Sequence, residues 1–117
     1  MNLFEFLDKS KTAYHATENV RKILLENGYT ELSETNEWKI VENGKYFLTR
    51  NGSALIAFSV GKSRSFNVVA AHTDSPCFKI KASPEIACEN YVKLDVEKYG
   101  GGIYHTFLDR PLTIAGR

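Results

Sequence analysis

The feature that most constrains the fold of this chain is a short apolar run that ends in a histidine and an aspartate. Residues 66–71 read FNVVAA, and a turn signal, Ser75-Pro76, follows shortly after them. An apolar run of this length that is rich in valine predicts a β-strand buried on both faces. Because open α/β sheets bind ligands just beyond the carboxyl ends of such strands, His72 and Asp74 are the first candidates for a functional site.

The preceding part of the chain predicts a helix and a hairpin, which together favour an α/β fold. In residues 13–27 apolar side chains recur with the period of an α-helix, which predicts a helix there. Thr12 is a candidate N-cap for this helix, and Gly28 follows its last periodic residue. Asn51-Gly52 lies between two apolar runs and predicts a β-hairpin. Further strands are predicted from apolar or alternating patterns at residues 39–41, 78–81, 91–96 and 103–108.

Composition excludes several classes of protein. The chain has 117 residues, of which 43% are apolar and 25% charged, which is typical of one globular domain. A formal net charge of +1 gives no electrostatic basis for binding nucleic acid or an anionic membrane, and no apolar stretch is long enough to span a bilayer. Cys77 and Cys88 do not make a disulfide scaffold, so a reducing cytoplasm is the expected location.

His72 and Asp74 admit three interpretations. Two residues apart in an extended chain, their side chains point to the same side, as a zinc ligand and the carboxylate that orients it would. A Ser–His–Asp triad with Ser75 is a second possibility, but no G-x-S-x-G motif surrounds that serine. A buried histidine that is hydrogen-bonded to Asp74 and has no function is the third, and spacing alone favours it.

The other possible metal ligands do not complete a zinc site. Zinc requires at least three protein ligands. His15 lies on the polar face of the predicted helix, and a glycine triplet separates His105 from His72. Cys77 and Cys88 have no standard zinc spacing, either to each other or to the histidines.

Three strings in the sequence resemble signatures of the aspartyl aminopeptidases, a family of cytosolic co-catalytic zinc exopeptidases. They occur in the family's order: TAYHA at residues 12–16, AHTDSPC at residues 71–77, and YGGGI at residues 99–103 followed by DRPL and AGR up to Arg117. The resemblance covers residues 4–117 and only the opening portion of the family's chain.

This resemblance implies a fold and a domain organisation. The family's peptidase domain is a mixed β-sheet packed between helices, into which a mostly β dimerisation domain is inserted. Residues 1–82 are therefore expected to be the N-terminal part of the zinc peptidase domain, and residues 83–117 the beginning of the inserted domain. A peptide substrate and a homo-oligomer are the implied partners, with no nucleic acid and no membrane.

The resemblance also implies roles for the two candidate residues. His72 is expected to be a zinc ligand, and Asp74 the catalytic carboxylate that orients and polarises it. In the family, two zinc ions activate a water that removes N-terminal residues, here expected to be Asp or Glu, from peptides. The bridging carboxylate and the glutamate base are expected beyond Arg117, so these 117 residues alone are predicted to be inactive. The alternative is a non-catalytic, truncated module that associates through an unfinished sheet.

Overall fold

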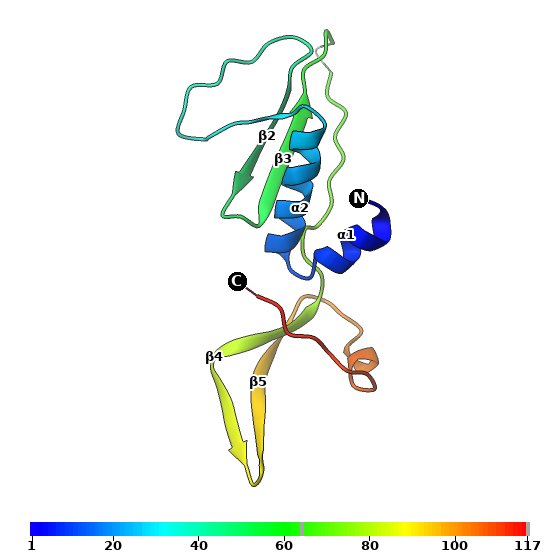
Figure 1. Ribbon diagram of the computed structural model, residues 1–117, viewed down its shortest axis with the longest axis vertical. Helices are drawn as coiled ribbons and strands as arrows, with labels where there is room; N and C mark the ends of the chain where they lie inside the picture. The colour runs from blue at the N-terminus through cyan, green and yellow to red at the C-terminus, as the bar shows by residue number, and fades with distance from the viewer. Residues whose placement is uncertain (64, 117) are drawn as a thin grey trace. The chain divides into compact units, whose positions relative to one another are not determined.

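The computed structural model describes residues 1–63 and 65–116, and its mixed α/β content agrees with the predicted fold class. Arg64, in a predicted turn, and Arg117, at the end of the last family string, lie outside the described residues. The chain divides into two compact units, the first made of Met1–Asp74 with Ala115 and Gly116 and the second of Ser75–Ile114 (Figure 1). None of the helices in the described ranges is long and apolar enough to cross a membrane.

The first unit begins with two capped helices. Helix α1, Leu3–Lys9, starts with a capping box between Asn2 and Glu5. Helix α2, Ala13–Glu26, confirms the second predicted helix. The Thr12 side chain accepts a hydrogen bond at its N-terminus, and Gly28 adopts a φ of 78° just past its end.

A three-stranded sheet completes the first unit. Strands β1, Thr30–Glu31, and β2, Lys45–Arg50, are parallel, and β3, Ala54–Ser59, pairs with β2 in antiparallel register. Asn51 and Gly52 have φ angles of 54° and 67°, and the Ser53 amide donates to the Arg50 carbonyl at 3.2 Å. These are the features of a type I′ turn, so the predicted hairpin is confirmed.

Helix α2 lies over one face of the β2–β3 hairpin (Figure 1), and the buried apolar residues of this unit come from β2 and α2. Phe47 is fully buried, and Tyr46, Leu48 and Ala16 are nearly so. The tyrosine hydroxyl accepts a hydrogen bond from the Val41 amide and donates one to the Lys39 carbonyl. The prediction of a strand at residues 39–41 is therefore wrong. The Tyr46 side chain, and not a neighbouring strand, provides hydrogen-bond partners for the backbone amide and carbonyl of this segment.

The second unit is a long hairpin followed by a helical turn. Strands β4, Cys77–Cys88, and β5, Tyr91–Tyr99, pair in antiparallel register. The pairing has a register irregularity between Ile80 and Glu85, and Pro84 lies there because proline is tolerated in a strand at such a position. The domain boundary expected after Ala82 falls within β4, and it stays a prediction about the complete protein.

The strand predicted at residues 103–108 is replaced by a 3₁₀ helix, η1, Tyr104–Phe107. The rings of Tyr104 and Phe107 lie 5.3 and 5.5 Å from the ring of Phe78 on β4, centroid to centroid. Contact of both rings with Phe78 requires Tyr104 and Phe107, three residues apart, to face the same way, which the alternation of an extended strand does not allow.

The buried strand predicted at residues 66–71 is also absent from the structure. These residues have no regular secondary structure, and the side chains of Phe66, Val68 and Val69 are 91%, 82% and 98% exposed. A strand that is buried on both faces needs paired neighbours and covering helices, and the described residues supply no strand that pairs with this run. The apolar run at residues 112–115 likewise forms no regular element.

Candidate metal site

His72 and Asp74 lie together at the end of the exposed apolar run. The Nδ1 atom of His72 is 3.0 Å from Oδ1 of Asp74, and the two side chains are 90% and 32% exposed. The prediction that the two side chains point to the same side is confirmed, although the backbone bends at Thr73 instead of continuing a strand. The interpretation of His72 as a buried structural histidine is wrong in one respect, since the imidazole is open to solvent.

This geometry suits an imidazole that binds a metal through its other nitrogen. When the Asp74 carboxylate accepts a hydrogen bond from Nδ1, the ring carries its lone pair on Nε2, which is accessible because the side chain is exposed. A carboxylate in this position fixes the orientation of a ligating histidine and raises its basicity. Imidazole nitrogen is also one of the donors that zinc prefers, so His72, oriented by Asp74, is suited to be one ligand of the predicted zinc ion.

Thr73, between the two candidates, was missed by sequence reasoning. Its hydroxyl donates a hydrogen bond of 2.7 Å to the carbonyl of Ser53, in the turn between β2 and β3. The sequence signal was its position at the centre of the H-x-D motif, where a side chain faces away from its two neighbours. The bond connects the motif to the hairpin, 20 residues earlier in the chain.

The remaining possible ligands are not gathered around His72. His15 makes a local contact of 2.8 Å with the Thr12 hydroxyl at the start of α2, as predicted for a histidine on a polar face. Cys77 and Cys88 are free thiols at the two ends of β4, and no disulfide joins them. Across residues 1–63 and 65–116, no three His, Cys, Asp or Glu side chains cluster in a way that could hold a metal ion.

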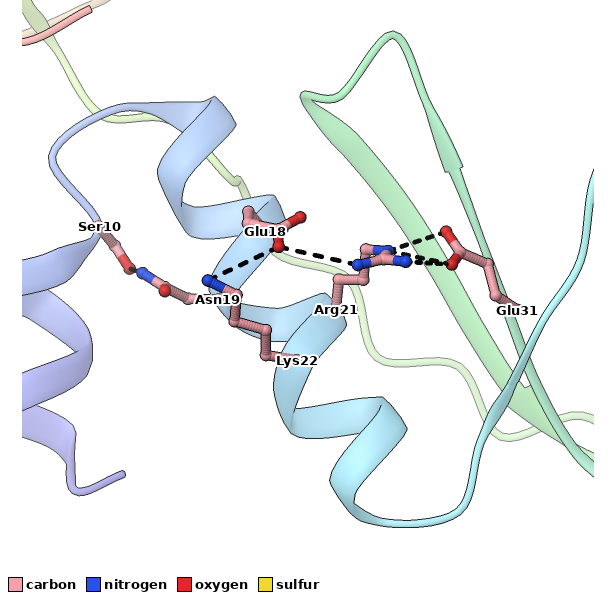
Figure 2. Close-up of polar contacts among 6 residues, drawn as sticks. All are labelled: Ser10, Glu18, Asn19, Arg21, Lys22 and Glu31. Atoms are coloured by element: carbon pink, nitrogen blue, oxygen red, sulfur yellow. Dashed lines mark hydrogen bonds and ion pairs between the residues drawn. The ribbon is translucent and has the colours of Figure 1, made fainter. Parts of the chain in front are cut away.

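A set of polar contacts that joins the elements of the first unit lies away from the candidate pair. Figure 2 shows a bidentate ion pair between Arg21 of α2 and Glu31 of β1. It also shows the Asn19 side-chain amide donating a hydrogen bond to the Ser10 hydroxyl at the end of α1. The hydrogen bond and the charge of Glu31 raise the pKa of Arg21, and the charge of Glu18 adds to this effect. These contacts join α1, α2 and β1, and His72 does not take part in them.

The sequence is similar to a family of known proteins along almost its whole length. Residues 6–117 match the family described as Aminopeptidase I zinc metalloprotease (M18). A probable M18 family aminopeptidase 2 of Clostridium acetobutylicum is 48% identical over 98% of this chain and 28% of its own length. Aspartyl aminopeptidase 1 of Schizosaccharomyces pombe is 42% identical over 100% of this chain and 26% of its own length.

Solved structures agree with the sequence comparison. A chain of the cryo-EM structure of the Ape4 and Nbr1 complex superposes on 91% of this chain with a TM-score of 0.85 and 42% identity. The mApe1 dodecamer of Saccharomyces cerevisiae superposes on the same share with a TM-score of 0.80 and 30% identity. The chain spans about a quarter of the length of the curated relatives it matches, 28% and 26% in the two cases above. By the match over residues 6–117, the chain belongs to the M18 family of zinc metallo-aminopeptidases.

Proposed function

We propose that this chain is the N-terminal part of a zinc aminopeptidase and that it contributes one metal ligand to the active site. The observation that carries the proposal is the contact of 3.0 Å between His72 and Asp74 inside a family match that covers residues 6–117. Residues 1–82 would begin the peptidase domain and residues 83–117 an inserted dimerisation domain.

In this proposal His72 would hold one of two zinc ions through Nε2, and the Asp74 carboxylate would fix the ring by accepting a hydrogen bond from Nδ1–H. Bound zinc supplies Lewis acidity, which lowers the pKa of a coordinated water and polarises the peptide carbonyl. Asp74 keeps the imidazole in one tautomer and one orientation, so the Nε2 lone pair is directed before the ion arrives. The carboxylate is catalytic in this sense only, because its hydrogen bond acts through the ligand.

The substrate and the assembly state follow from the relatives as proposals. Relatives named aspartyl aminopeptidase support hydrolysis of an N-terminal Asp or Glu from a peptide. A neighbour solved as a dodecamer supports a homo-oligomer for the complete protein. We also place the complete enzyme in the cytoplasm, where the free thiols of Cys77 and Cys88 would stay reduced.

The test is a pair of histidine substitutions in the full-length protein. His72→Ala should lower the zinc content per protomer and abolish hydrolysis of peptides with an acidic N-terminal residue. His15→Ala is the matched control, because His15 bonds only locally to Thr12 and should keep both zinc and activity. Full zinc content and full activity in His72→Ala would refute the assignment.

A further inference from the structure

We propose that Thr73 is a positioning residue for the metal site: its hydroxyl, bonded to the Ser53 carbonyl, holds the His72–Asp74 pair ready to receive the ion. This inference rests on the proposed function, because it assumes that His72 is a ligand. The observation behind it is independent of the contact between His72 and Asp74, since the hydrogen bond of 2.7 Å from Thr73 to Ser53 involves neither of those two side chains.

The acceptor of this bond is fixed in space. Ser53 ends the type I′ turn of the β2–β3 hairpin, and its own amide donates to the Arg50 carbonyl at 3.2 Å. The hairpin pairs in register from Lys45 and Ser59 to Arg50 and Ala54 and carries the buried Phe47. A carbonyl on such an element moves little, so it can serve as an anchor for a less ordered segment.

The segment that carries His72 needs such an anchor. Residues 65–72 have no regular secondary structure, and the His72 side chain is 90% exposed, so surrounding side chains do not fix its direction. Thr73 is half-buried, and its bond to the hairpin determines how the backbone turns at the bend between the two candidates. The Thr73 hydroxyl thus ties the backbone between His72 and Asp74 to the hairpin, while the two candidate side chains contact each other.

The expected effect on zinc binding follows from the fraction of molecules with a competent site. When only a fraction of the protein has the ligand correctly placed, the apparent dissociation constant rises in inverse proportion to that fraction. A hydrogen bond of this kind changes a conformational equilibrium by about 3- to 10-fold. Loss of the Thr73 hydroxyl should therefore weaken zinc binding by about 3- to 10-fold, which is at or below the lower limit of about 10-fold for groups that bond directly to a metal ligand.

The experiment compares three substitutions in the full-length protein. Thr73→Val removes the hydroxyl at nearly constant shape, and Thr73→Ser keeps it. Thr106→Val is the matched control, because the Thr106 hydroxyl also donates to a backbone carbonyl, that of Ile103 at 2.8 Å, in the second unit. Two quantities are measured: the zinc dissociation constant, by competition with a chelator, and amide hydrogen exchange of residues 66–76 in the metal-free protein.

Thr73→Val should raise the zinc dissociation constant about 3- to 10-fold and speed exchange in residues 66–76, whereas Thr73→Ser and Thr106→Val should change neither. Should Thr73→Val fail to fold, Thr73→Ala must give the same two changes. Unchanged zinc binding in both hydroxyl-deletion variants, with zinc lost from His72→Ala, would overturn this inference and leave the proposed function intact. Zinc retained in His72→Ala would instead remove the proposed function.

Discussion

Removal of the Phe47 side chain should destabilise the first unit more than any exposed aromatic substitution. Phe47 on β2 is fully buried, and it is the largest fully buried side chain in the described residues. Replacement of a buried phenylalanine by alanine loses transfer free energy and leaves a cavity, which together cost about 3–5 kcal/mol. Phe4 on α1 is 78% exposed, so Phe4→Ala is the matched control and should change stability by about 0.5 kcal/mol or less.

The assay is urea denaturation of the 117-residue chain, followed by far-ultraviolet circular dichroism. With a urea dependence of about 2 kcal/mol per molar, Phe47→Ala should lower the midpoint by about 1.5–2.5 M. If the parent chain is less stable than this, the variant should show no cooperative transition at all, while Phe4→Ala still does. Equal midpoints for Phe47→Ala and Phe4→Ala would show that the Phe47 side chain is not part of the core that stabilises the first unit.

Three further predictions concern the metal motif and the segment that follows it. Asp74→Asn in the full-length protein should weaken zinc binding about 10- to 100-fold, measured by chelator competition, and an unchanged affinity would contradict the orienting role. Gly102→Ala should destabilise the second unit, because a Cβ there would lie 2.8 Å from Cβ of Pro76, whereas Gly101→Ala meets nothing within 4 Å; equal melting temperatures would contradict this packing. Removal of zinc from the full-length protein by a chelator should abolish peptide hydrolysis, and added zinc should restore it; activity that survives complete removal would exclude a metal mechanism.

The elements that could be predicted from sequence are those whose signals are local. Helix α2 has its cap at Thr12 and its terminating glycine at Gly28, and the β2–β3 turn requires the positive φ angles that Asn51-Gly52 supplies. Each signal lies within a few residues of the element that it determines, so no distant part of the chain was needed.

The elements that were predicted wrongly depend on distant contacts. A strand at residues 66–71 would require neighbouring strands that the described residues do not provide. Residues 103–108 have an apolar pattern that a strand could use, but Tyr104 and Phe107 turn toward Phe78, 26 residues earlier in the case of Tyr104, and form η1. The periodicity of apolar residues cannot predict such a contact, because it shows which face of a segment is apolar but not which other residues that face packs against.

In the candidate site, too, local features could be predicted from the sequence and contacts between distant residues could not. The two-residue spacing of His72 and Asp74 was sufficient to predict that their side chains lie together. The bond from Thr73 to Ser53 joins residues 20 positions apart, so spacing could not indicate it. The family strings added the role of a zinc ligand, which geometry alone does not assign to an exposed histidine–aspartate pair.

The most direct test of the central claim is the zinc–ligand geometry in a crystal structure of the full-length protein, with the ion located by anomalous scattering. We predict a zinc ion about 2.0–2.1 Å from Nε2 of His72, with the Asp74 carboxylate still within hydrogen-bond distance of Nδ1. A fully occupied zinc site in which His72 is not a ligand, or in which it binds through Nδ1 with Asp74 turned away, would contradict this prediction.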